Sequence, residues 1–223
     1  MNLTAPVNKK NSGKVAYLTF DDGPSKHTDQ LLEILKRYSV KGTFFVIANR
    51  SPYGIRMYKK MMRHGHVIGN HSYSHDYSRI YSSKKLFFAD FYRMERLLSR
   101  VTGRKPRLFR FPGGSNTTIG YSQGGHKTMQ SIKAALRSRN YPYFDWTIDS
   151  HDSLRPYLSP RQMIRNVLQE SQRQSKCSLL FHDFSDISVK ALPAIIQGLK
   201  RQGFRFDVLS SHSYNYHLGE GNS

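Results

Sequence analysis

The sequence predicts an α/β protein built on a parallel sheet and closed into a barrel. Seven short apolar runs have the length and the β-branched or aromatic content of buried strands. Segments with helical spacing of apolar residues lie between these runs, which is typical of parallel strands joined by helices. Polar side chains able to do chemistry follow one strand after another, and barrel enzymes gather their active sites at that end of the strands. This placement favours a barrel over a doubly wound sheet.

The strands are expected where apolar runs end in turn residues or polar clusters. The first run, 15–20, is apolar at nearly every position, as in a strand buried on both faces. The seven predicted strands span residues 15–20, 43–47, 66–69, 108–111, 143–147, 178–181 and 205–209.

The helices are expected where apolar residues recur at steps of three and four, which places them on one face. Pro160 suits the first turn of one helix, and Gly103 and Gly203 suit the ends of two others. The five predicted faces are Leu31, Ile34, Leu35 and Tyr38; Phe87, Phe91, Met94 and Leu98; Met129, Ile132 and Leu136; Ile164, Val167 and Leu168; and Leu192, Ile195, Ile196 and Leu199.

The chain is expected to form a single domain, because 223 residues suffice for one sizeable core. Residues 1–14 are polar and predict a flexible lead-in, residues 15–210 the folded domain, and residues 211–223 a C-terminal tail. No apolar stretch approaches the roughly 18 residues of a membrane span. The N-terminus shows no signal-peptide pattern, although an exported parent with its leader removed fits as well.

The formal net charge is +20, from 35 Lys and Arg against 15 Asp and Glu. Such a surface attracts polyanions, including nucleic acid, an anionic envelope and a cell wall. No zinc-finger or RNA-recognition motif is present, so a specific nucleic-acid partner is not expected. The single cysteine, Cys177, rules out an intrachain disulfide and is predicted to be a small core residue. Cysteine content leaves both an exported and a cytosolic location open.

Two groups of residues predict a metal site. Asp21 and Asp22 end the first strand, where two carboxylates can serve as one metal ligand and one base. His71 and His75 are four positions apart, and on a helical turn they would share a face and reach one ion. An Asp with two His is a usual ligand set for catalytic zinc, with a fourth position left for water.

These motifs, Thr-Phe-Asp-Asp-Gly-Pro at 19–24 and His-Ser-Tyr-Ser-His at 71–75, resemble those of the polysaccharide deacetylase family, the NodB-homology domain. The resemblance covers about residues 15–209 and five motif blocks in order. It implies a distorted barrel of seven β/α units. It also implies that Asp22, His71 and His75 bind a divalent metal, usually zinc, with Asp21 as the general base. The same ligands would accept cobalt, manganese or nickel.

The block at 108–114 resembles the third motif of the family. The resemblance implies that Arg110 orients Asp21 and that Pro112 and Gly113 form part of the substrate site. Many relatives carry Tyr at the position of Gly113, whose backbone N–H helps to bind the oxyanion, and glycine keeps that N–H. Leu180 matches the apolar position that receives the acetyl methyl group.

His182 is expected to be the general acid that protonates the departing nitrogen. A carboxylate partner would orient it and raise its pKa, and both Asp149 and Asp152 are candidates. The block around them begins with Trp146, a candidate substrate-binding residue. Relatives often carry Trp after the second Asp of this block, where this chain has Ser153.

The resemblance implies metal-dependent N-deacetylation of a polysaccharide that contains N-acetylglucosamine. Peptidoglycan is the first choice, because a basic surface suits an anionic cell wall. Chitooligosaccharides or poly-N-acetylglucosamine are alternatives, O-acetylated xylan is less favoured, and a non-catalytic module that binds polyanions or glycans on the same fold is the competing class. The expected location is extracellular or wall-associated, with the cytoplasm as the alternative.

Overall fold

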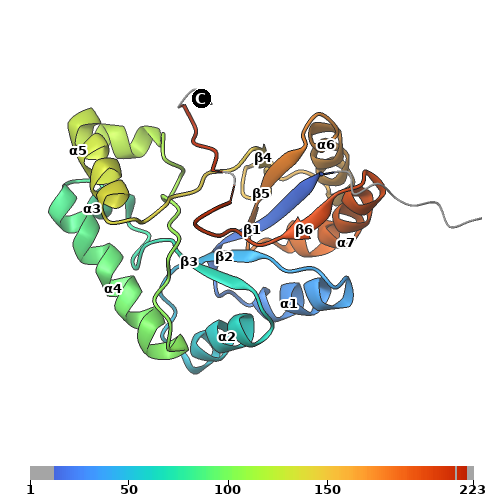
Figure 1. Cartoon of the computed structure of the whole chain (residues 1–223), viewed down its shortest axis with the longest axis horizontal. Coiled ribbons are helices and arrows are strands. Elements are labelled where there is room, and N and C mark those ends of the chain that lie inside the picture. Colours follow the sequence, from blue (N-terminus) through green and yellow to red (C-terminus); the bar gives the residue numbers. More distant parts are fainter. Residues whose placement is uncertain (1–12, 214, 220–223) are drawn as a thin grey trace, which may run out of the picture.

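The computed structural model describes residues 13–213 and 215–219 and shows parallel strands surrounded by helices (Figure 1). The strands among these residues are β1 (Val15–Gly23), β2 (Thr43–Val46), β3 (Val67–Asn70), β4 (Ile148–Asp149), β5 (Lys176–His182) and β6 (Arg205–Asp207). The helices are α1 (Thr28–Arg37), α2 (Pro52–Arg63), α3 (Tyr77–Ile80), α4 (Lys84–Thr102), α5 (Thr118–Ser138), α6 (Pro160–Gln172) and α7 (Asp186–Arg201).

Strand β1 lies at the centre of the sheet, whose order is β3-β2-β1-β5-β4. One edge of β1 pairs with β5 along most of its length. The other edge pairs first with β6 and then, from Thr19 onward, with β2. Because every one of these pairings is parallel, the carboxyl ends of the strands meet at one end of the sheet.

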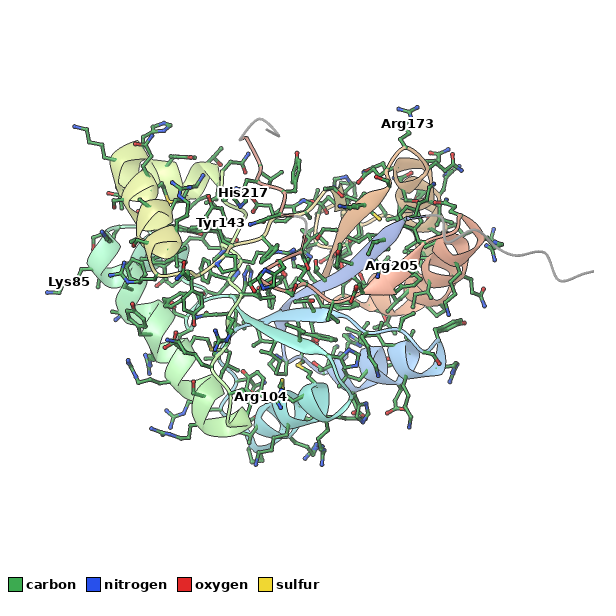
Figure 2. The ribbon with its side chains drawn as sticks, viewed as in Figure 1. Lys85, Arg104, Tyr143, Arg173, Arg205 and His217 are labelled. Atoms are coloured by element: carbon green, nitrogen blue, oxygen red, sulfur yellow. The ribbon has the colours of Figure 1, made fainter. Side chains whose placement is uncertain are left out.

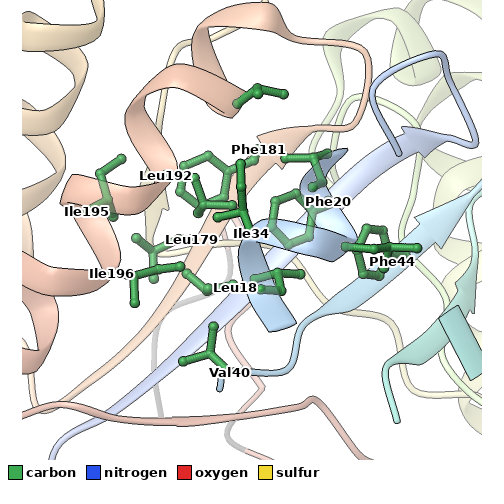
Figure 3. Packing of buried hydrophobic residues seen from close by; sticks show 14 of the residues in the cluster. Leu18, Phe20, Ile34, Val40, Phe44, Leu179, Phe181, Leu192, Ile195 and Ile196 are labelled. Atoms are coloured by element: carbon green, nitrogen blue, oxygen red, sulfur yellow. The ribbon is translucent and has the colours of Figure 1, made fainter. Parts of the chain in front are cut away.

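The outward face of β1 builds the main core against the helices. Ala16, Leu18 and Phe20 are fully buried there, as the alternation of side chains along a strand requires. The Phe20 ring stacks on Phe44 and on Phe181, with ring centroids 4.8 Å and 5.6 Å apart. Figure 3 shows Phe20 and Phe181 lying between Phe44 and the aliphatic side chains of α7.

The inward face of β1 is apolar at its start and polar at its end. Val15 and Tyr17 form a small buried cluster with residues from other strands and loops. Thr19 and Asp21 continue the same face and are also buried, at 0% and 3% exposure. The interior of the barrel therefore changes from apolar to charged toward the carboxyl ends of the strands.

The barrel closes through two single-residue bridges. Phe109 pairs with Asn70 at the end of β3 and with Tyr143 on its other side. The predicted strands 108–111 and 143–147 are therefore wrong as continuous strands, and β4 begins only at Ile148. Pro112 and Pro142 have no N–H to donate to a ladder, which limits the pairing to one residue.

The five predicted helical faces are confirmed in α1, α4, α5, α6 and α7. Two helices were not predicted, α2 and the single turn α3. A signal for α2 was present, because Ser51 caps the helix by accepting from the Gly54 N–H and Pro52 follows at the first position. The buried residues Met57, Tyr58 and Met61 mark its inward face.

The C-terminal segment, predicted as a tail, packs on the barrel where it is described. The ring of His217 stacks on Tyr143 at 4.1 Å (Figure 2), and the Leu218 N–H donates to Asp145. The predicted lead-in falls almost entirely in residues 1–12, which lie outside the described residues. Among the helices of the described part, none has the length and apolarity needed to cross a membrane.

Strands β2 and β3 approach so closely at Gly69 that no side chain fits there without a shift. A Cβ atom at Gly69 would lie 2.4 Å from Cδ1 of Phe45, a fully buried ring. We therefore expect Gly69→Ala to lower the free energy of unfolding by about 1–3 kcal/mol, measured by urea titration. In a Phe45→Leu background the added cost should shrink, because the two changes share one contact. An equal cost in both backgrounds would contradict this explanation.

Candidate metal and acid–base site

The two carboxylates at the end of β1 face the same site because the strand is irregular there. Side chains at successive strand positions normally point to opposite faces. The register of β1 against β2 shifts between Asp21 and Gly23, and Asp22 has a positive φ of 67°. As a result Asp21 Oδ2 and Asp22 Oδ1 lie 3.6 Å and 3.5 Å from Nε2 of His71.

The two histidines meet through a loop and not through a helical turn, so that prediction was wrong. Residues 71–76 follow β3 without helical structure, and Ser72 and His75 adopt positive φ angles of 76° and 55°. The ring centroids are 5.2 Å apart. The buried Asp90 of α4 stabilises the loop by accepting from backbone N–H groups, including that of Ser74 at 3.1 Å.

His71 is oriented as a metal ligand would be. Its Nδ1–H donates to the carbonyl of Arg110 at 2.8 Å, which leaves Nε2 with its lone pair directed at the carboxylates. Burial lowers the pKa of His71 and so favours the neutral imidazole, the form that binds metal.

Asp22, His71 and His75 fit a metal ion. Their ligand atoms all lie within 4.8 Å of one another. Asp22 Oδ1 is 3.1 Å from His75 Nε2, yet this buried oxygen makes no hydrogen bond to a described residue. Tetrahedral coordination at ordinary zinc bond lengths needs donor atoms about 3.4 Å apart. Burial alone would raise the pKa of Asp22, but His75, His71 and His182 together lower it to about 2, so the carboxylate is ionised.

Arg110 contacts Asp21 inside the barrel, as expected from the resemblance. Its side chain is fully buried, and Nη1 donates to Asp21 Oδ1 at 2.9 Å and to Thr19 Oγ1 at 2.7 Å. The other guanidinium nitrogens donate to the carbonyls of Phe144 and Asp145. Asp21 Oδ1 is thus fixed, and Oδ2 is the oxygen that faces His71.

The turn that follows Arg110 presents a free backbone donor. Gly113 has a φ of 77°, and in the described part of the chain its N–H donates to no protein group. The turn is held in place by the Tyr81 hydroxyl, which donates to the carbonyl of Pro112 at 2.7 Å. Asp145 also holds it, by accepting from the N–H of Ser115 at 2.9 Å.

The ring of Tyr77 occupies the space beside Gly113. A Cβ atom at Gly113 would lie 3.0 Å from Tyr77 Cε1, so a larger residue there would need this ring to move. The same ring packs edge-on against His75, with centroids 5.1 Å apart. Tyr77 thus links the histidine loop to the turn, a position that sequence reasoning missed.

His182 pairs with Asp152, which decides between the two predicted partners. Nδ1 of His182 lies 2.7 Å from Asp152 Oδ1, whereas Asp149 accepts from the N–H of His151. Asp152 is itself held, because its Oδ2 accepts from the His182 N–H at 2.8 Å and from the Ser188 hydroxyl. Burial opposes protonation of His182, but Asp152, Asp21 and Asp22 outweigh it and raise the pKa to about 9.

The remaining predicted residues lie near this site or in the core. Leu180 is buried and shares a face of β5 with His182. The Trp146 ring lies 5.7 Å from the Arg110 guanidinium, and a Cβ atom at Gly114 would lie 3.1 Å from that ring. Cys177 is fully buried, and burial raises the pKa of its thiol to about 12, which confirms the core prediction.

Sequence reasoning missed the residues that support the site. Thr19, Asp90 and Asp145 are buried polar residues that position Arg110, the histidine loop and the turn. A signal existed for Asp90, because it interrupts the apolar face formed by Phe87, Phe91 and Met94. A carboxylate at such a position is expected to have a buried partner.

Comparison with known proteins gives consistent matches over most of the chain. A family model described as polysaccharide deacetylase matches residues 8–131. A peptidoglycan-N-acetylglucosamine deacetylase of Bacillus cereus is 33% identical over 96% of this chain and 76% of its own length. The catalytic domain of a peptidoglycan N-acetylglucosamine deacetylase from Eubacterium rectale superposes with a TM-score of 0.88, at 35% identity and with 94% of each chain covered. A polysaccharide deacetylase from Bacillus cereus gives a TM-score of 0.81 at 30% identity, covering 94% of this chain and 98% of its own.

The contact between His182 and Asp152 should determine the pKa of the His182 imidazole. In metal-stripped protein, the imidazole of His182 should titrate near pH 9, and Asp152→Asn should lower that pKa because burial then dominates. A raised pKa in the folded state stabilises the protein below about pH 6.5, and this stabilisation is lost as the pH rises through about 9. NMR titration of the His182 ring, with Ser188→Ala as the control that keeps the carboxylate, measures the shift. An unchanged pKa in Asp152→Asn would disprove the assignment.

Proposed function

The chain belongs to the polysaccharide deacetylase family. We propose that it hydrolyses the N-acetyl groups of peptidoglycan N-acetylglucosamine and releases acetate. The resemblance drawn from the sequence motifs and the predicted barrel are both confirmed by the comparisons. The main support for this mechanism is the orientation of the Asp21 carboxylate. Its fixed Oδ1 contacts Arg110, while its Oδ2 lies 3.6 Å from Nε2 of His71, one of the three candidate metal ligands.

Asp22, His71 and His75 would hold the divalent metal on which the family depends. We propose zinc, since an oxygen and two imidazole nitrogens in this arrangement suit it, and cobalt, manganese and nickel accept similar ligands. When bound, such an ion supplies positive charge that polarises an acyl carbonyl and lowers the pKa of water.

Asp21 acts as the general base. Arg110 and Thr19 hold one oxygen of its carboxylate, so the other is presented in one orientation. In the proposed reaction Asp21 Oδ2 takes a proton from a water molecule, and the water oxygen forms a bond to the acetyl carbon. The carbonyl oxygen of the substrate then carries the negative charge.

Gly113 and His182 complete the reaction. The free N–H of Gly113 donates to the oxygen on which negative charge develops. His182 uses Nδ1 to contact Asp152, which leaves Nε2 to give its proton to the amide nitrogen. The carbon–nitrogen bond breaks, and the products are acetate and a free amine on the sugar. Leu180 and Trp146 line the site that receives the acetyl group and the sugar.

Several observations support peptidoglycan as the substrate. The relatives from Bacillus cereus and Eubacterium rectale are named for activity on peptidoglycan N-acetylglucosamine. The net charge of +20 favours association with an anionic wall, and an extracellular or wall-associated location is part of the proposal. Chitooligosaccharides and poly-N-acetylglucosamine contain the same sugar and are the alternatives. A binding module without activity is disfavoured, because every proposed acid, base and metal position is filled.

Acetate release tests this function. We expect metal-dependent release from N-acetylated peptidoglycan, at a higher rate than from N-acetylglucosamine oligomers. Asp21→Asn should lower kcat at least about 100-fold while metal content stays unchanged, since general-base catalysis is lost but the ligands remain. Asp186→Asn, which alters an exposed carboxylate paired with Lys190, is the matched control and should keep full activity. Absence of acetate from both substrates, with metal bound, would contradict the proposal.

A further inference from the structure

Phe184 is an exposed aromatic residue on a fixed backbone. Its side chain is 44% exposed, whereas its neighbours Asp183 and Ser185 are 0% and 5% exposed. The Asp183 N–H donates to the carbonyl of Asp21 at 2.8 Å, and its carboxylate accepts from Thr28 at 2.7 Å. Ser185 caps α7, and its hydroxyl donates to the carbonyl of Asp152. The ring is therefore held in solvent by well-anchored residues on both sides.

The ring of Phe184 lies beside the proposed proton donor. Its centroid is 5.3 Å from that of His182, with 41° between the ring planes. His182 is the last residue of β5 and pairs in register with Asp21, and Phe184 follows two positions later. A flat apolar surface is thus presented at the edge of the site where the amide nitrogen of a substrate would accept its proton.

Other exposed apolar side chains lie on the adjoining loop. Five large apolar residues are exposed in the described part of the chain, and three of them follow β4 or β5, namely Leu154, Tyr157 and Phe184. The contact between Asp152 and His182 joins these two loops. Single exposed apolar residues are common on proteins, but Phe184 lies beside a proposed catalytic group, where an exposed apolar side chain suits a ligand. The Tyr157 ring already contacts Arg155 on one face, at 5.2 Å.

We propose that Phe184 is the platform on which a pyranose ring of the glycan stacks. One face of a pyranose carries C–H groups, and these pack well against the electron-rich face of an aromatic ring. This inference rests on the proposed function, and it adds the prediction that the enzyme prefers oligosaccharides to a minimal acetyl substrate. Because the backbone around Phe184 is already ordered, little conformational entropy is lost when the sugar binds.

Steady-state kinetics on an N-acetylglucosamine tetramer and on para-nitrophenyl acetate test the platform with the metal-loaded protein. Phe184→Ala should raise KM for the tetramer by about tenfold and leave kcat and its pH profile nearly unchanged. Hydrolysis of the small ester should not change. Phe184→Trp should keep the low KM, whereas Phe184→Leu, which is apolar but not flat, should not. Leu86→Ala removes an exposed apolar side chain from α4 and should have no effect.

An unchanged KM in Phe184→Ala would overturn the proposal. So would equal losses on both substrates with an altered pH profile, because the ring would then act by supporting His182. Calorimetry of tetramer binding to the Asp21→Asn protein, with and without Phe184→Ala, separates this inference from the proposed function. If the unaltered metal-loaded protein releases no acetate but Phe184→Ala still weakens tetramer binding about tenfold, the deacetylase assignment fails and the platform stands.

Discussion

The ion pair between Arg110 and Asp21 is the interaction on which the rest of the site depends. A guanidinium with no solvent exposure must be paired and fully hydrogen-bonded, or its burial becomes strongly unfavourable. Arg110 meets this requirement with the side chains of Thr19 and Asp21 and the carbonyls of Phe144 and Asp145. These partners come from β1 and from the segment that precedes β4. The contact that orients the proposed base therefore also joins β1 to the segment that closes the barrel.

Buried aspartates stabilise the loops around this pair. Asp90 holds the histidine loop, Asp145 holds the turn at Gly113, and Asp152 holds His182. Each accepts at least one hydrogen bond from a backbone N–H group, which fixes the local backbone, and Asp152 is in addition paired with the imidazole of His182. With Asp21 and Asp183 also buried, a third of the 15 acidic residues lie inside the protein. The surface is consequently more positive than the net charge alone suggests.

The sequence predicted the parts of the fold that depend on local pattern. Strand β1 and the five helical faces follow from the spacing of apolar residues, and the site residues from their positions after strands. The path of the histidine loop depends on positive φ angles at Ser72 and His75, which no residue pattern there requires. The bulge that turns Asp22 toward Asp21 likewise depends on pairing with β2. The choice of Asp152 over Asp149 was open, because both follow the same strand and only the turn between them decides which reaches His182.

The central place of β1 has a consequence for folding during synthesis. Its partner β5 comes late in the chain, and the Thr19 hydroxyl donates to a carbonyl 160 residues away. Contacts between such distant residues form slowly, because a long loop must close before they stabilise anything. Asp21 and His182, which pair in register, cannot come together until β5 has left the ribosome. Until then one edge of the apolar strand β1 is unpaired and the other can pair only with β2, and such a segment tends to aggregate or to require a chaperone.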